Sequence, residues 1–333
     1  MLKLLLTYFC CYSFLLVKAT DLKCLDCDSL DIVKDTLPVK TNLSDGLPAY
    51  VKKKRIVGVA AANIIGYGGS MALLYQAWYK NYPRSNFHTI NDNKEWMQID
   101  KVGHVYSAYI ESKASMEIWR WAGLSRNKRI WIGGMSGAVY QTVIEVLDGY
   151  SAEWGWSWGD FAANIAGSGI FVAQELAWNQ QKVQMKFSFH RADYSGDPQI
   201  AQQINTLFGS STASRMLKDY GAQTYWLSAN IKSFLPKTKL PGWLNLAVGY
   251  GAQNIYGPYG NIWDDPFVPG NIIDKSAIPR YRQWYLAPDI DFTRIKTKNK
   301  FLKIAFFALN AFKFPTPSLE LSQGRLRWNW LHF

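Results

Sequence analysis

The pattern of hydrophobic and polar positions along the chain changes its period near residue 182. Between residues 56 and 182, long apolar stretches are interrupted by polar positions three or four residues apart, which is typical of helices. From residue 183 onward, short segments alternate apolar and polar residues, as half-buried strands do. The pattern therefore predicts an α+β protein: a bundle of about four helices, then a β-rich part of antiparallel strands, which we expect to be associated with a membrane.

The first apolar segment, residues 56–79, is rich in glycine and alanine. We interpret it as a helix that is buried or lies on a membrane surface, and a membrane-spanning helix is the alternative because the segment is long enough to cross a bilayer. Glycine or an Asp-Gly pair ends two of the helices that follow. Those expected helices are residues 100–122, a segment carrying residues 131–147, and a segment from Ser157 or Asp160 to residue 181.

The later segments are mostly strand-like, at residues 183–190, 224–234, 243–253, 282–293 and 319–333, while residues 199–220 are helical or irregular. The last segment alternates strictly over residues 325–333 and ends on Phe333, which is typical of outer-membrane strands. A membrane barrel normally has at least eight strands, and only five or six are predicted. Either the sheet is partial or small, or the helices complete the structure.

The N-terminus has the composition of a secretory signal, with Lys3 followed by an apolar run and a cleavage site expected near Ala19. We divide the chain into a signal peptide (1–19), an irregular basic leader (20–55), a helical domain (56–182) and a β-rich region (183–333). In an oxidising compartment, Cys24 and Cys27 are expected to form a local disulfide.

Composition agrees with an exported protein. Aromatic residues make up 15% of the chain and include 15 tryptophans, while charged residues make up only 19%. Tryptophan and tyrosine concentrate where one side is apolar and the other is wet, as at a membrane interface. The formal net charge of +12 favours anionic partners, but no nucleic-acid-binding module is present. We therefore expect export to the outer membrane or periplasm and no nucleic-acid partner.

Three pairs of polar residues stand within the apolar helices: Asp100/His104, Glu145/Asp148 and Asp160/Asn164. Their spacing places each pair on one helix face, and buried carboxylates are costly unless they are paired. The pattern favours one shared polar site, and a purely structural network, with Asp100 and Asp160 as helix caps, is the alternative.

The chemistry of these residue types suggests specific roles. His104 would act as general base with Asp100 orienting its ring, and Glu145 completes the catalytic candidates. Asp148, Asp160 and Asn164 are the candidate ligands of a divalent cation, because hard cations prefer oxygen ligands.

The motifs Asp100-Lys101-x-x-His104, Glu145-x-x-Asp148-Gly149 and Ser157-x-x-Asp160-x-x-x-Asn164 resemble the YfiM-like family of predicted bacterial envelope proteins. The likeness covers roughly residues 56–190, including Trp154-Gly155-Trp156-Ser157 and Lys186-Phe187-Ser188-Phe189-His190. A fainter VanZ-like resemblance covers only the Asp-Lys-x-x-His and Asp-x-x-x-Asn elements. The YfiM-like resemblance implies an envelope location and no established reaction. Its shorter members are predicted lipoproteins, whereas here Phe9 and Lys23, not small residues, precede Cys10 and Cys24.

Together these features predict an envelope protein of unknown biochemical activity, associated with the outer membrane of a Gram-negative bacterium. The alternative is a metal-assisted or acid/base enzyme that acts on an envelope lipid or glycan. The expected partners are membrane lipid or an envelope glycan, and other envelope proteins.

Overall fold

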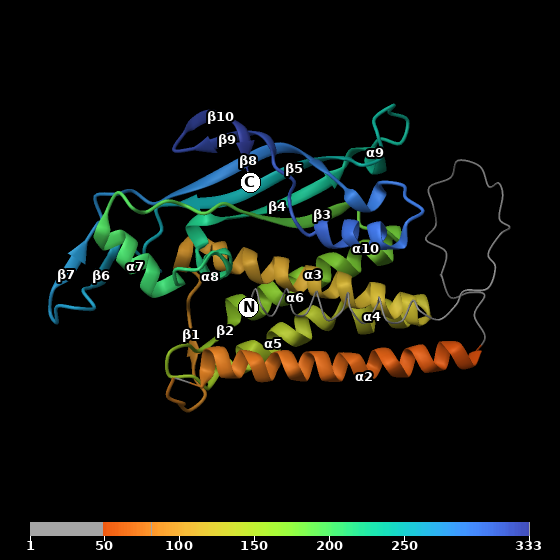
Figure 1. Cartoon of the computed structure of the whole chain (residues 1–333), viewed down its shortest axis with the longest axis horizontal. Helices are drawn as coiled ribbons and strands as arrows, with labels where there is room; N and C mark the ends of the chain where they lie inside the picture. The colour runs from red at the N-terminus through yellow and green to blue at the C-terminus, as the bar shows by residue number, and fades with distance from the viewer. Residues whose placement is uncertain (1–48, 81, 333) are drawn as a thin grey trace.

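The computed structural model describes residues 49–80 and 82–332 (Figure 1). The predicted signal peptide, the Cys24–Cys27 disulfide and most of the leader lie outside the described residues. The N-terminal part is helical and also holds a two-stranded parallel sheet. Its elements are α2 (Ala49–Leu74), β1 (Thr89–Ile90), α3 (Ile99–Ala122), α4 (Arg126–Gly134), α5 (Ser136–Gly149), β2 (Trp156–Ser157) and α6 (Trp158–Trp178).

The C-terminal part is built on an open, six-stranded antiparallel sheet with strand order β10-β9-β8-β5-β4-β3. Its strands are β3 (Val183–Phe189), β4 (Gln223–Asn230), β5 (Leu244–Gln253), β8 (Tyr281–Ile290), β9 (Thr316–Ser322) and β10 (Arg325–His332). In Figure 1 this sheet lies on one side of the molecule, α2 lies on the other side, and the remaining long helices lie between them.

Shorter elements connect the strands. A small hairpin of β6 (Ile262–Asp264) and β7 (Ile272–Asp274) stands apart from the main sheet (Figure 1). The helices of this part are α7 (Pro198–Phe208), α8 (Thr212–Lys218), α9 (Ile231–Phe234) and α10 (Lys300–Leu309).

The predicted fold class is confirmed: helices come first and an antiparallel sheet follows. Three boundaries were wrong, and one helix was missed. The leader is helical from Ala49, so the basic residues 52–55 lie in the first turns of α2. The expected helix over residues 131–147 is broken at Met135 into α4 and α5. The segment predicted as one strand over residues 319–333 forms, in its described residues 319–332, parts of two strands, because Gln323 and Gly324 make a tight turn with positive φ. Helix α10 was not predicted.

Local signals set the ends of the helices that carry the polar pairs. Gly123 has φ 91° and ends α3 as predicted. The Ser157 side chain accepts a hydrogen bond from the Asp160 backbone N–H at 3.1 Å and caps α6. The Asp160 carboxylate is therefore not the helix cap. Asp100 also makes no capping bond, since Gln98 holds the N-cap position of α3. Both carboxylates remain available for other contacts.

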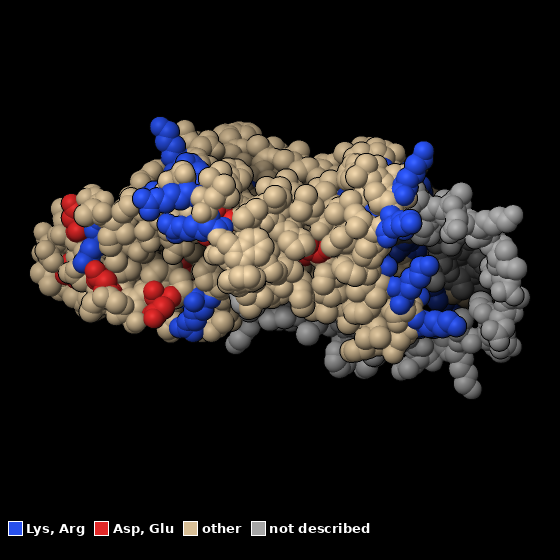
Figure 2. Space-filling view, turned by 90° about the horizontal axis from the view of Figure 1, so that it is seen from above, with Lys and Arg blue, Asp and Glu red and all other residues tan. Residues whose placement is uncertain are grey.

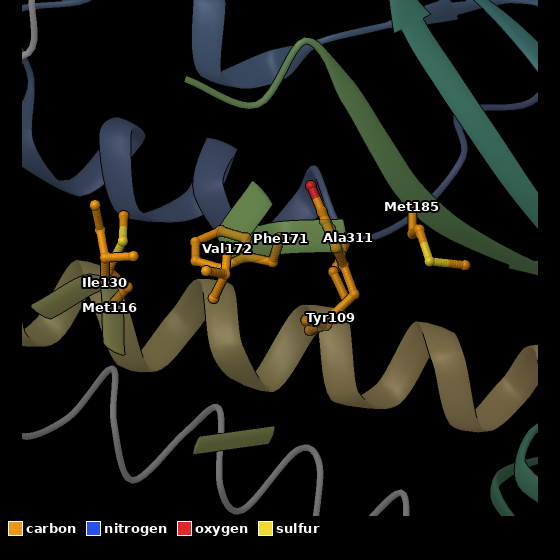
Figure 3. Close-up of a cluster of buried hydrophobic side chains, with 8 residues drawn as sticks. Tyr109, Met116, Ile130, Phe171, Val172, Met185 and Ala311 are labelled. Carbon is orange, nitrogen blue, oxygen red and sulfur yellow. The ribbon is translucent and has the colours of Figure 1, made fainter. Parts of the chain in front are cut away.

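A hydrophobic cluster joins the helical part to the sheet. Figure 3 shows Tyr109 and Met116 of α3 with Ile130 of α4, Phe171 and Val172 of α6, Met185 of β3 and Ala311. Tyr109 and Phe171 meet edge to face, with ring centroids 5.7 Å apart. This cluster fixes α3 and α6 against β3, and so positions the polar residues on the same two helices.

The main sheet has its apolar face outward. One row of paired residues across five strands points to solvent, and every member is 40% exposed or more: Leu227, Val248, Leu286, Leu319 and Trp328. The opposite face is buried and largely polar, with Asp289, Asn245 and Ser228 all at most 1% exposed. A sheet packed on a core in water shows the reverse arrangement.

The helices repeat this inversion. On α6 the exposed face carries Ile165, Ile170 and Leu176, whereas Asn164 and Glu175 are buried. Helix α5 likewise exposes its valines and buries Gln141 and Glu145. The segments Tyr50–Leu74 and Arg126–Gly149 are long and apolar enough to cross a membrane by length and composition, and only 11% of the first apolar window is buried.

Exposed charge is concentrated toward the two ends of the long axis. Figure 2 shows the sheet side of the molecule with lysine and arginine in two groups and a mostly uncharged band between them. The described part of the chain thus combines apolar outer faces on its sheet and helices with an interior that holds buried polar groups as well as hydrophobic clusters.

Candidate functional site

His104 lies at the centre of a buried polar cluster built from α3, α5 and α6. Its Nδ1 is 3.1 Å from the Asn164 Oδ1 atom and 3.7 Å from the Glu145 Oε1 atom. Its Nε2 is 3.6 Å from the Asp160 Oδ1 atom and 3.9 Å from the Asp100 Oδ1 atom. The structure therefore brings together five of the six predicted site residues, and their chemical roles stay predictions.

Asp148 is the predicted site residue that points elsewhere. Its Oδ1 atom accepts a hydrogen bond of 2.6 Å from the hydroxyl of Tyr79, which ends the π-helical segment Tyr75–Tyr79 after α2. The contact ties that end of α2 to α5. The predicted ligand set of Asp148, Asp160 and Asn164 is thus divided between two places, and only the last two residues lie at His104.

The three helices approach closely because small residues stand where they cross. A Cβ atom on Gly137 of α5 would lie 2.1 Å from the Ala108 backbone oxygen of α3. A Cβ atom on Gly167 of α6 would lie 2.1 Å from the Val105 backbone oxygen. Only glycine fits such contacts, and they allow short side chains on α5 and α6 to reach His104.

Lys101 is a residue of the cluster to which the sequence assigned no role. Its Nζ atom is 2.6 Å from Asp92 Oδ2, 2.8 Å from Asp160 Oδ1 and 3.4 Å from Asp100 Oδ2. In the sequence, Lys101 is marked only by its position in the Asp-Lys-x-x-His motif. Its partner Asp92 lies in a loop, where no periodic pattern marks it.

Two hydroxyl groups complete the cluster. The Tyr220 hydroxyl donates a hydrogen bond of 2.6 Å to Asp100 Oδ1, and the Ser157 hydroxyl donates one of 2.6 Å to Asp92 Oδ1. Burial alone would raise the pKa of Asp92, but the hydrogen bonds and positive charge of Lys101, with the Ser157 bond, more than offset it and lower the pKa. Asp92 is therefore an anion that anchors Lys101.

The arrangement suits proton transfer or cation binding. Ligand atoms of Asp100, His104 and Asp160 all lie within 4.8 Å of one another, as the first ligands of a metal do. With all carboxylates ionised and a neutral imidazole, Asp92, Asp100, Glu145 and Asp160 carry four negative charges against the single positive charge of Lys101. Burial raises the pKa of Glu145 to about 8 and that of Asp160 to about 7. Bound protons or a divalent cation would balance the surplus of negative charge, so the residues fit such an ion.

Residues 90–175 match the model of a family described as predicted periplasmic lipoprotein (DUF2279). The DUF2279 match covers α3 to α6, and so includes every residue that surrounds His104 except Tyr220. The description agrees with the predicted exported, envelope location. All four cysteines, the residue type to which a lipoprotein's lipid is attached, lie outside the described part of the chain. The finer YfiM-like and VanZ-like resemblances stay predictions. No curated protein and no solved structure gives a significant match to the chain.

Proposed function

We propose that the protein is an integral component of the outer membrane of a Gram-negative bacterium, with its apolar exterior in lipid and its polar residues inside. The observation that carries this proposal is the inverted sheet, in which Leu227, Val248 and Leu286 face outward while Asp289 and Asn245 are buried. Strands of membrane proteins alternate in this way when one face meets lipid and the other a polar interior.

The lengths of the elements support membrane insertion along the long axis. Helix α6 has 21 residues and begins and ends with an exposed tryptophan, Trp158 and Trp178. At about 1.5 Å per residue these two side chains are about 30 Å apart, which is the thickness of a bilayer's hydrocarbon core. Tryptophan is enriched at the two boundaries of that core.

Lipid also requires that the edges of the sheet find backbone partners. At one edge, the Phe187 N–H donates to the Ala311 oxygen at 3.0 Å, and the Lys313 N–H donates to the Phe187 oxygen at 2.8 Å. At the other edge, β10 begins with Arg325 and carries Arg327. This edge would either pair with a further strand or lie at the level of the lipid headgroups.

Fractionation of the full chain in its host or in a Gram-negative expression strain tests the proposal. We expect recovery in the outer-membrane fraction after density separation, with resistance to extraction by alkaline carbonate. Recovery in the soluble periplasm, or release by carbonate, would remove the proposal. Leu286→Lys should reduce the membrane-integrated yield, since a lysine in the lipid midplane costs about 2–4 kcal/mol. Thr297→Lys, in a basic loop near one end, is the matched control.

A second candidate function is an acid/base or metal-assisted enzyme that acts on an envelope lipid or glycan. It is favoured by the contacts of His104 with carboxylates on both of its ring nitrogens. His104 would be the general base, with Asn164 fixing the ring through Nδ1 and Asp100 or Asp160 facing Nε2. A divalent cation held by Asp100, His104 and Asp160 would polarise a substrate oxygen.

Metal analysis of the purified full chain tests the cation. Wild-type protein should retain a divalent cation in about equimolar amount after dialysis, and His104→Ala should lose it. His88→Ala, which removes an imidazole outside the cluster, should keep it. Equal metal content in all three proteins, or none in the wild type after incubation with zinc, manganese or magnesium, would contradict cation binding.

A further inference from the structure

A second polar region lies at the other end of α3 from His104. It is a cavity of about 950 Å³ between α3, α6, α10 and the segment that follows β8. Arg120 of α3 and Lys303 of α10 are among the residues that line the cavity. Arg120 is 16 positions after His104, which corresponds to about 24 Å along the helix. The cavity is therefore separate from the His104 cluster.

Positive charge dominates the lining of this cavity. Three of its side chains are acidic: Glu117, Glu175 and Asp291. Six are cationic: Lys113, Arg120, Lys232, Arg294, Lys296 and Lys303.

Two of the arginines are already neutralised locally, since Arg120 pairs with Glu117, and Arg294 Nε is 3.1 Å from Asp291 Oδ2. Within residues 49–80 and 82–332, Lys232, Lys296 and Lys303 make no ion pair. These three lysines leave a surplus of positive charge that suits an anionic group.

The same cavity has an aromatic wall. Phe306 and Phe307 of α10 line it together with Phe292 and Phe171. On the outside of α10, Phe301 is 68% exposed and Leu302 is 39% exposed, so this helix is apolar on its outer side as well. A ligand that fills the cavity would meet cations at one part of its surface and phenylalanine rings at another. An amphiphile with an anionic head and an apolar tail is complementary to such a lining.

We infer that the cavity binds an anionic lipid, with its phosphate among Lys232, Lys296 and Lys303 and the start of its acyl chains against Phe306 and Phe307. Basic pockets beside membrane-embedded elements bind lipid headgroups in this way. The inference rests on the proposed membrane location for the supply of the ligand. In Figure 1, α9 and α10, which border the cavity, lie toward the end of the sheet opposite the β6-β7 hairpin, and headgroups would be found at the ends of the long axis.

Binding is tested with the full chain purified in a non-ionic detergent, so that the result does not depend on membrane insertion. Dihexanoyl phosphatidylglycerol is titrated calorimetrically, with dihexanoyl phosphatidylcholine and inorganic phosphate in parallel. We expect saturable binding of the phosphatidylglycerol and binding of the other two at least about tenfold weaker. The triple variant Lys232→Glu, Lys296→Glu, Lys303→Glu should weaken binding by about a hundredfold, because each lysine near a lipid phosphate contributes a factor of about five to the affinity.

The matched control is the double variant Lys237→Glu, Lys239→Glu, which changes two exposed lysines that do not line the cavity. It should bind like the wild type. Circular dichroism and thermal unfolding check that each variant is folded, and single Lys→Gln variants replace any that is not. Equal binding by triple variant and wild type would overturn the inference. Inorganic phosphate binding as tightly as the lipid would overturn the assignment to lipid. If the protein were not embedded in the membrane, the fractionation experiment would show it, and the binding experiment in detergent would be unaffected.

Discussion

Two polar regions in the interior of the protein differ in the balance of their charges. Beneath the sheet, Lys186 Nζ is 2.7 Å from Asp289 Oδ2, and both side chains are fully buried. Ser228 donates a hydrogen bond of 2.6 Å to the same carboxylate, and Asn245 donates one of 2.8 Å to Ser228. The Asp289 Oδ1 atom makes no hydrogen bond with any residue that the structure describes, but Lys313 Nζ lies 4.0 Å from it, so this carboxylate lies between two lysines.

The His104 cluster is different. Three carboxylates face one lysine there, and the buried Asn164 Nδ2 atom makes no hydrogen bond with any residue that the structure describes. Unmatched buried polar groups are costly in a purely structural network. The comparison teaches that the carboxylate under the sheet is matched by lysines, which suits a structural role, whereas the surplus of carboxylates at His104 suits a cation, a proton or a substrate.

The largest expected effect concerns the network under the sheet. Asp289→Ala leaves Lys186 buried without its carboxylate, and we expect a loss of about 3–5 kcal/mol in the free energy of unfolding. Lys186→Met combined with Asp289→Leu should recover much of that loss. His104→Ala should cost only about 1 kcal/mol. Urea unfolding in detergent measures all three. If Asp289→Ala and His104→Ala lowered the free energy of unfolding equally, the two regions would not differ in their contribution to stability.

The next effect concerns the helix crossing that assembles the His104 cluster. Gly137→Ala places a methyl group against the Ala108 backbone, so α3 and α5 must separate, at a cost of about 1–3 kcal/mol. Gly169→Ala is the matched control, because its Cβ would meet nothing within 4 Å, and it should stabilise α6 by about 0.5–1 kcal/mol. A stabilising Gly137→Ala would show that the helices do not cross as described.

A smaller effect, a change in cation affinity, tests whether the His104 cluster is a ligand site or a purely structural network. Asn164→Asp adds a carboxylate beside His104, so affinity for a divalent cation should rise by about tenfold. Competition with a chelating dye measures it, and Asn63→Asp on α2 controls for the added charge. Unchanged affinity in Asn164→Asp would indicate that the cation, if bound, lies away from this position.

The smallest effect concerns Asp92. Its pKa is lowered in the folded protein, so the stabilisation that Lys101 provides is fully present above the ordinary value of 3.8 and is lost as the pH falls through the lower, folded-state value. Asp92→Asn should therefore reduce thermal stability at pH 7, and the difference from the wild type should narrow below pH 4. A difference that grows toward acid pH would contradict this assignment.

The sequence predicted the three polar pairs because each depends on helical spacing, a local property. It did not predict Asp92 or Tyr220, because these residues reach the cluster from separate segments and no local pattern marks them. Asp148 illustrates the limit in the other direction: its helix face was predicted, but the Tyr79 hydroxyl turns its carboxylate away.

The sheet shows a second limit. Alternation gives the period of a strand but not which face is inward, and in water the apolar face would be buried. Here Leu286 is 42% exposed while Asp289, three positions later on β8, is 1% exposed. Among the strands, the aromatic, alternating C-terminal segment was the one whose sequence pointed to lipid. The other strands show their orientation only once the cross-strand register is known.

The most direct test of an apolar exterior in lipid is spin labelling of Leu286→Cys in the full chain reconstituted in lipid vesicles, with Cys10, Cys11, Cys24 and Cys27 replaced by serine. Lys237→Cys serves as the comparison position at the basic end. We predict that the label at position 286 collides mainly with dissolved oxygen, which partitions into lipid, and that the label at position 237 collides mainly with a water-soluble nickel chelate. Free access of the nickel chelate to position 286 would contradict the membrane-embedded orientation.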